Sequence, residues 1–241
     1  MARIEQVNDK ELRRTVMIKR SAQAEQEYTL LSKLDSPRII RPVKLTEDGL
    51  ILPFYPQRAA DGLAGYCSER EAWRFIRDVS EGLAYLHGKD IIHKDIKPSN
   101  ILIGDDGYVI SDFDMDTDPT SHAFTPPEWD SKRTGITEKS DIWSLGASVF
   151  TLINGSYLFS GRGGSAQTEK TVIPALPVRF SRELSDTIRQ CLSYNPSERP
   201  SAEDLHRLGK KMAEVSMEKK VEIRKTADHH GVHEDIWPEA M

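Results

Sequence analysis

The segment IIHKDIKPSNILI (91–103) concentrates polar residues whose chemistry suits phosphoryl transfer. A carboxylate such as Asp95 can accept the proton of an attacking hydroxyl, Lys97 can neutralise a transferred phosphate, and Asn100 can bind a magnesium ion. Apolar runs on both sides indicate a loop between two short strands. The alternative is an ordinary polar loop in which Asp95 serves only as a turn residue.

The octet HKDIKPSN (93–100) resembles the H-R-D-x-K-P-x-N catalytic loop of the eukaryotic-type protein kinases. The lysine two residues after the aspartate resembles the serine/threonine class rather than the tyrosine class. This resemblance, which covers roughly residues 10–210, implies ATP-dependent phosphate transfer to serine or threonine hydroxyls of a protein substrate, with Mg²⁺ or Mn²⁺. It assigns catalytic roles to Asp95, Lys97 and Asn100.

Four motifs farther along the chain resemble landmarks of the same family: VISDFD (109–114), TPPEW (125–129), DIWSLG (141–146) and SERPSAEDL (197–205). The first implies that Asp112 binds the metal together with Asn100. The third implies that Asp141 braces the backbone of the catalytic loop. The fourth implies that Arg199 pairs with Glu128.

Residues nearer the N-terminus resemble the part of the family's site that holds the nucleotide. VMIK (16–19) offers Lys19 for the α- and β-phosphates, and Glu27 stands where the partner of that lysine usually falls. Glu25 lies one helical step away, so either glutamate could face inward. Leu102 would form the floor under the adenine.

The chain has no glycine before Gly49, so the glycine-rich loop that folds over the phosphates in this family is absent. Only glycine lets backbone N–H groups approach phosphates that closely. We therefore expect the phosphates of bound ATP to be more exposed to solvent than is usual in the family. An activating partner protein could cover them in place of the loop. The residues expected around the adenine also differ from the family's pattern. Met17 replaces a small alanine, and Pro53 lies near the gatekeeper position. Pro56 lies near the hinge residue that normally donates a backbone N–H to the adenine, which proline cannot do.

Two further departures concern regulation. Asp114 replaces the glycine of D-F-G, and Lys94 replaces the arginine of H-R-D. Arginine grips an activation-segment phosphate with a planar fork, whereas lysine is only a point charge. The sequence therefore predicts activity that does not need phosphorylation of the activation segment.

The predicted elements form an α+β, two-lobed protein-kinase-like fold with a small, truncated β-rich N-lobe and a larger helical C-lobe. Strands are expected at 3–7, 13–20, 38–45 and 50–55, and helices at 21–34, 68–90, 138–155, 182–193 and from about 201 onward. Residues 160–180 are punctuated by Gly and Pro and are expected to be a loop. The single domain, residues 1–241, divides into an N-lobe (1–56), a C-lobe (57–210) and a C-terminal helical extension and tail (211–241).

The composition of the chain indicates which classes of binding partner to expect. The 241 residues carry 33 Lys and Arg against 38 Asp and Glu, a formal net charge of −5, so the chain as a whole lacks the basic footprint of nucleic-acid or anionic-membrane binding. No apolar run is long enough for a membrane helix, and the N-terminus has no secretory segment. We therefore expect a cytoplasmic protein that binds neither nucleic acid nor membrane.

Two alternatives to an active kinase stay open. The open nucleotide site and the prolines near the hinge favour a pseudokinase scaffold with weak or no nucleotide turnover. The D-F-D sequence at 112–114 also resembles the aminoglycoside and choline kinase group, which would indicate a small-molecule phosphotransferase. The intact metal pair and base argue against the scaffold, and the P-P-E, D-I-W-S-L-G and E-R-P-S motifs argue against the small-molecule enzyme.

Overall fold

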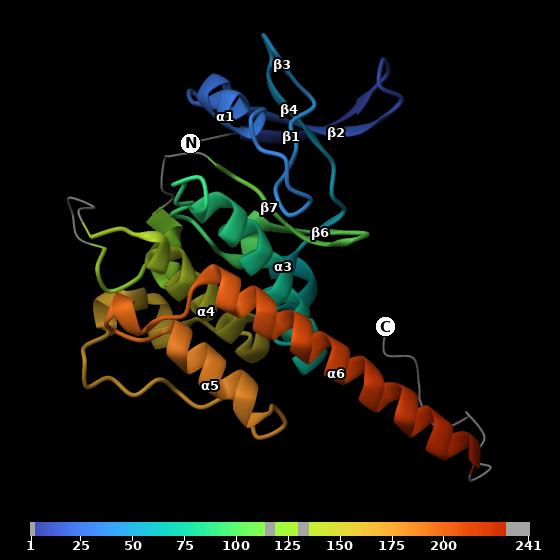
Figure 1. The fold of residues 1–241 in the computed structure, drawn as a ribbon. Coiled ribbons are helices and arrows are strands. Elements are labelled where there is room, and N and C mark those ends of the chain that lie inside the picture. The colour runs from blue at the N-terminus through green and yellow to red at the C-terminus, as the bar shows by residue number, and fades with distance from the viewer. Residues whose placement is uncertain (1–2, 114–118, 130–134, 230–241) are drawn as a thin grey trace.

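Four antiparallel strands form the N-terminal sheet in the order β1–β2–β4–β3 (Figure 1). They are β1 (Arg3–Asp9), β2 (Arg14–Arg20), β3 (Lys44–Thr46) and β4 (Gly49–Pro53). The structure is a computed structural model that describes residues 3–113, 119–129 and 135–229. β4 lies between β2 and β3, and its apolar residues Leu50, Ile51 and Leu52 are all buried.

The helix α1 (Ala24–Leu31) packs on this sheet and is shorter than the predicted 21–34. Its start is delayed because residues 21–23 form a turn in which the N–H of Gln23 donates to the Ser21 hydroxyl at 3.3 Å. The buried side of α1 carries Ala24 and Leu31 and also the carboxylate of Glu27. A charged group therefore lies on a face that is otherwise apolar.

Most of the remaining chain is helical. The helices are α2 (Ala59–Leu63), α3 (Glu69–His87), α4 (Glu138–Asn154), α5 (Arg182–Cys191) and α6 (Ala202–His229). A second sheet, in the order β5–β6–β7, consists of β5 (Gln57–Arg58), β6 (Ile101–Gly104) and β7 (Gly107–Ile110). Short 3₁₀ turns lie at Pro98–Asn100, Pro119–Phe124, Leu158–Gly161, Gly163–Ala166 and Pro196–Glu198.

Capping residues explain where the long helices begin and end. The Ser68 hydroxyl accepts the N–H of Glu71 at 3.2 Å at the start of α3, and Thr137 caps the start of α4. Gly155 ends α4 with a φ of +68°, a conformation that glycine adopts without strain. The core of the larger lobe forms around α3 and α4, where Trp73 and Trp143 are fully buried.

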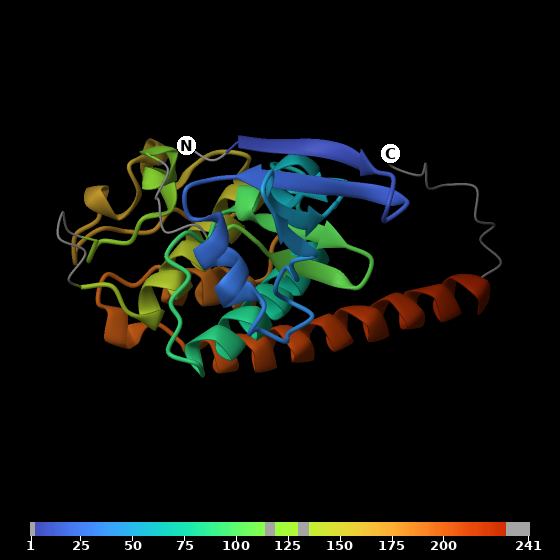
Figure 2. The same cartoon turned by 90° about the horizontal axis from the view of Figure 1, so that it is seen from above.

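The last helix packs along α3 and then projects beyond the rest of the molecule (Figures 1 and 2). Leu205 is buried, and Leu208 and Met212 pack against the core. The helix is continuous across residue 210, the predicted end of the C-lobe. In the described part of the chain, no helix is long and apolar enough to cross a bilayer.

Two of the predicted strands differ in the structure. The strand expected at 38–45 forms only at Lys44–Thr46, because Pro37 and Pro42 lack the N–H that a sheet ladder needs. Of the two strands expected around the segment 93–100, only the second one, β6, is present. The remaining architecture is the predicted α+β arrangement of a small sheet-containing lobe and a larger helical lobe.

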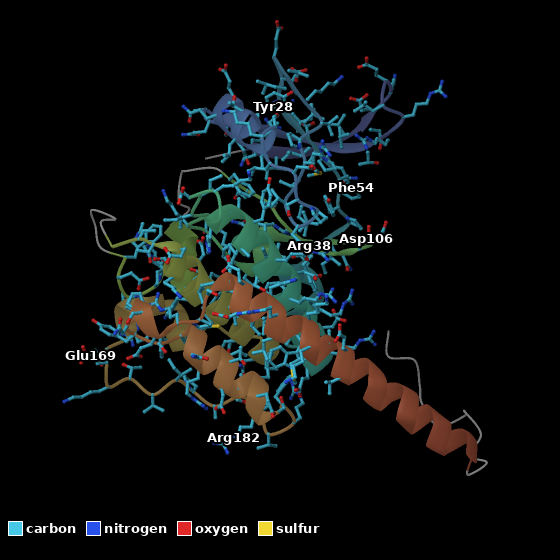
Figure 3. The ribbon with its side chains drawn as sticks, in the orientation of Figure 1. Tyr28, Arg38, Phe54, Asp106, Glu169 and Arg182 are labelled. Carbon is cyan, nitrogen blue, oxygen red and sulfur yellow. The ribbon has the colours of Figure 1, made fainter. Side chains whose placement is uncertain are left out.

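Residues 38–40 link the two lobes instead of forming a strand. The N–H of Ile40 donates to the Ile110 carbonyl at 2.9 Å, and the N–H of Ile110 donates to the Arg38 carbonyl at 2.8 Å. The Arg38 guanidinium also donates to the Asp106 carbonyl at 2.8 Å, and Figure 3 shows the two residues together. This link joins the N-terminal lobe to β7, whose end leads to Asp112.

Candidate active site

A buried cation lies between two carboxylates where β2, α1 and the segment after β7 meet. Lys19 Nζ is 2.7 Å from Oε2 of Glu27 and 2.6 Å from Oδ1 of Asp112. Lys19 is 1% exposed and Glu27 is 2% exposed, whereas Glu25, the alternative partner, is exposed. Oε1 of Glu27 also accepts the N–H of Phe113 at 3.0 Å. One carboxylate therefore holds both the lysine and the backbone beside Asp112.

The charges in this cluster stabilise one another. Burial lowers the pKa of Lys19, but the carboxylates of Asp112 and Glu27 outweigh burial, so the pKa lies above its ordinary value. Burial raises the pKa of Glu27, and the Lys19 ammonium offsets only part of that rise. Lys19 therefore stays positively charged at neutral pH and can attract a phosphate.

The segment 93–100 turns its polar side chains toward one another. Oδ2 of Asp95 lies 2.9 Å from Nζ of Lys97 and accepts a 2.9 Å hydrogen bond from Nδ2 of Asn100. The same Asn100 amide donates to the Asp95 carbonyl at 2.9 Å, and Pro98 begins the 3₁₀ turn that carries Asn100. These contacts fix the orientation of the Asp95 carboxylate, as a positioned proton acceptor requires.

Asp141, at the start of α4, holds the backbone of this segment through hydrogen bonds. Its carboxylate accepts the N–H of His93 at 2.9 Å and the N–H of Lys94 at 2.8 Å, and His87 Nε2 lies 2.9 Å away. Lys94 has a φ of +72°, which is uncommon for a residue with a side chain. The predicted bracing by Asp141 is confirmed, and it helps to hold a strained backbone conformation next to Asp95.

The predicted ion pair between Arg199 and Glu128 is also confirmed. The Arg199 guanidinium donates to Oε1 of Glu128 at 2.6 Å and to Oε2 at 2.8 Å. Arg199 is only 2% exposed and also donates to the Ser193 and Lys139 carbonyls. This fork-to-fork contact ties the end of the segment 119–129 to the helical lobe.

A cavity of about 460 Å³ lies between the two lobes. Its lining contains every predicted site residue except Glu27, which lies behind Lys19: Lys19, Asp95, Lys97, Asn100, Leu102 and Asp112. The structure therefore brings together residues from β2, the segment 93–100, β6 and the segment after β7. Short motifs that are far apart in the sequence therefore line one cavity, and ligands bind most often in such cavities.

One side of the cavity is apolar. Met17 and Leu52 come from the N-terminal sheet, and Leu102 comes from β6, so a flat ring could fit between the lobes. Ile4 also lines the cavity although the sequence analysis did not identify it. Ile4 pairs with Lys19 in the β1–β2 hairpin, so the predicted hairpin could have indicated its position.

The cavity mouth carries the two prolines at the predicted hinge. Pro53 and Pro56 both line the cavity, and neither can donate a backbone N–H to a ligand. Arg58 and Asp61, which the sequence analysis did not identify either, line the same mouth and form a 2.7 Å ion pair. Both are exposed, and no sequence signal distinguishes them from ordinary surface charges.

The donor set fits a magnesium ion that is shared with phosphates. The described residues contain no group of three His, Cys, Asp or Glu side chains that could hold a metal by themselves. Mg²⁺ typically uses one or two carboxylates together with substrate phosphates and water. Asp112, whose side chain is 36% exposed, and Asn100 lie in the same cavity and could provide this partial set. Asp114, the residue in place of the D-F-G glycine, lies outside the described residues.

Comparison with known proteins places this geometry in a family. The family model described as the protein kinase domain matches residues 3–208. Mitogen-activated protein kinase kinase kinase 3 of Arabidopsis thaliana is 30% identical over 207 residues, covering 76% of this chain and 34% of that protein. Serine/threonine-protein kinase ppk11 of Schizosaccharomyces pombe is 33% identical over 207 residues, covering 75% of this chain and 65% of that protein.

An Aurora kinase of Yarrowia lipolytica is 33% identical over 153 residues, covering 58% of this chain and 41% of that protein. The chain therefore spans between 34% and 65% of the length of these relatives. The match to the family model covers most of the chain and includes all the residues of the candidate site. The chain belongs to the protein kinase family.

Proposed function

We propose that this chain is an active serine/threonine protein kinase that uses ATP and Mg²⁺ or Mn²⁺. One observation carries the proposal: the charge cluster around Lys19 and the polar group around Asp95 line the same cavity. Each set is held in place by buried contacts, from Glu27 in the first and Asp141 in the second. A scaffold without turnover would need neither set.

In this proposal the nucleotide is held from both lobes. Lys19, oriented by Glu27, binds the α- and β-phosphates, and Leu102 supports the adenine. Asn100 and Asp112 hold the metal ion, which when bound neutralises charge on the phosphates. Residues 1–56 act as the N-lobe, 57–210 as the C-lobe and 211–241 as an extension.

Transfer is assigned to the segment 93–100. Asp95 accepts the proton of the substrate hydroxyl, and Lys97 neutralises the γ-phosphate as it moves. Positioning and charge stabilisation supply most of the rate enhancement in this reaction. The missing glycine-rich loop therefore weakens the hold on ATP without removing a reacting group, and a partner protein that covers the cleft would raise activity.

The test is transfer of labelled phosphate from ATP to a generic basic protein and to the chain itself, with Mg²⁺ and then with Mn²⁺. We expect Asp95→Ala to lower the rate by about a hundredfold or more and Lys19→Ala to lower it sharply. Asp105→Ala and Lys33→Ala alter exposed residues outside the cavity and serve as matched controls.

A pseudokinase scaffold is the second candidate, because Pro53 and Pro56 remove backbone donors at the cavity mouth. Absence of transfer under every condition, with and without cellular extract as a source of partner, would favour it. Transfer only to small hydroxylated molecules would instead favour a small-molecule phosphotransferase. Binding of ATP to the purified monomer with the affinity usual for kinases would argue against the need for a partner.

A further inference from the structure

A second cavity, of about 570 Å³, adjoins the segment that carries Asp95. Ser99 lines both this cavity and the nucleotide cavity, and Pro98 lines the second one as well. The second cavity therefore opens beside the position where a substrate hydroxyl must approach Asp95. We propose that it receives an uncharged, apolar side chain of the protein substrate, close to the phosphorylated serine or threonine. This inference rests on the proposed function.

The chemistry of the lining supports an apolar occupant. Apolar side chains come from α2, the segment 119–129 and the turn after α4, and include Ala60, Phe124 and Tyr157. No Asp, Glu, Lys or Arg is present among the described residues of this lining. A charged side chain that entered would lose its water without meeting an opposite charge, which is costly. An apolar side chain would gain by leaving water.

Two polar groups of the wall already form hydrogen bonds within the protein. The Thr151 hydroxyl donates to the Ala147 carbonyl at 2.8 Å. The Leu152 carbonyl accepts the N–H of Gly65 at 2.8 Å. Arg58, just before α2, and Asp61, within it, also neutralise each other through a 2.7 Å ion pair. The wall therefore offers these groups neither to an arginine nor to an acidic side chain.

The cavity has a fixed shape. The rings of Phe124 and Tyr157 meet edge to face with centroids 5.8 Å apart, and the Phe124 carbonyl accepts the Ser144 hydroxyl at 2.7 Å. Near the end of α4, a Cβ added to Gly155 would lie 3.1 Å from the Cα of Gly65. A preformed wall keeps the ordering cost of binding low.

The cavity is also accessible to a polypeptide. Tyr157 is 58% exposed, and Ser156, Ser160 and Ala64 at its rim are exposed as well. A substrate segment that places its hydroxyl at Asp95 passes Ser99 and can lower a neighbouring side chain into the cavity. Selectivity for that side chain would then act on the same complex in which phosphate is transferred.

The first experiment measures kcat/KM for a library of serine peptides in which each flanking position in turn is leucine or arginine. For the wild-type chain we expect leucine to exceed arginine by about tenfold or more at one flanking position, as one filled apolar pocket typically provides. Ala64→Trp, which fills the cavity from its exposed rim, should remove this advantage. The KM for ATP should stay unchanged.

The second experiment reverses the preference. Ser156→Glu adds a carboxylate at an exposed position of the lining and should raise the use of the arginine peptide about tenfold relative to leucine. Gln190→Glu adds the same charge on an exposed face of α5 outside both cavities and should leave the preference unchanged.

The outcomes separate this inference from the proposed function. If peptides are phosphorylated without a preference for leucine, or with a preference for arginine, the inference is wrong and the function stands. It is also wrong if Ser156→Glu and Ala64→Trp both leave the preference of the wild type unchanged. No transfer to any peptide, to a generic protein or to the chain itself overturns both.

Discussion

Lys19 and Asp112 are separated by 93 positions in the sequence, and the Nζ of Lys19 lies 2.6 Å from the Oδ1 of Asp112. The same ammonium contacts Glu27, so a single buried cation connects β2, α1 and the segment after β7. Replacing Lys19 by methionine would leave Glu27 buried without its cation. We expect Lys19→Met to lower the free energy of unfolding by about 3 kcal/mol or more, because breaking a buried ion pair leaves an uncompensated charge.

Urea unfolding at neutral pH measures this loss. The double variant Lys19→Met with Glu27→Gln should recover part of the stability, because it removes the unpaired carboxylate, while phosphate transfer stays low. Glu25→Gln, at an exposed position of the same helix, is the matched control and should change neither property. Equal stability of Lys19→Met and the wild type would contradict the assignment of this pair as a buried support.

Asp141 accepts two backbone N–H groups from the strained segment at Lys94. Asp141→Asn keeps the shape but removes the charge, and we expect a loss of about 1–3 kcal/mol in stability with slower phosphate transfer. The KM for ATP should change little, because Asp141 does not line the nucleotide cavity. A rise in that KM with an unchanged kcat would show that Asp141 does not act by positioning Asp95.

Gly164 holds the segment 119–129 by close backbone packing. Its N–H donates to the Thr125 carbonyl at 2.8 Å, and an added Cβ would lie 2.2 Å from the backbone nitrogen of Pro127. Gly164→Ala should therefore displace this segment and weaken use of the protein substrate, at a stability cost of about 1–3 kcal/mol. Gly88→Ala, where φ is −65°, is the control. Unchanged kinetics toward the protein substrate in Gly164→Ala would rule out this role.

Both cysteine thiols are expected to be unreactive in the folded chain. Burial raises the pKa of Cys67, with a smaller contribution from Glu71, and burial raises the pKa of Cys191, in each case from 9.0 to about 12. Because the folded pKa exceeds the unfolded one, the stability contributed by the neutral thiols is present below pH 9 and is lost as the pH rises toward 12. Native chain at about pH 8 should resist a thiol-labelling reagent, whereas urea-unfolded chain should react fully. Rapid labelling of the native chain would show that these sites open readily.

Activity should not depend on phosphorylation of the activation segment, since lysine replaces arginine at position 94. Treating the purified chain with a phosphatase, then removing the phosphatase, should leave the transfer rate unchanged. Lys94→Arg should not create a strong dependence by itself unless a phosphate is present nearby. Loss of activity after dephosphorylation, restored by incubation with ATP, would contradict this prediction.

The elements that short-range patterns specify were predicted well. The strands β1 and β2 follow from alternating apolar spacing, and α3 and α4 follow from helical or continuous apolar patterns. The strand predicted at 38–45 forms only from Lys44 onward, because periodicity gave the apolar residues more weight than Pro37 and Pro42. Ile39 and Ile40 are apolar because they are buried where this segment meets β7, which is a tertiary reason.

The sequence by itself determined which reacting groups are present, because Asp95, Lys97 and Asn100 stand within six residues and a tight turn must bring them together. It could not choose between Glu25 and Glu27, since both lie near the start of one helix. The tertiary structure decided that choice, because only the face of α1 that packs on the sheet can reach Lys19. It also decided the existence of the second cavity, because that cavity depends on surfaces contributed by segments far apart in the chain.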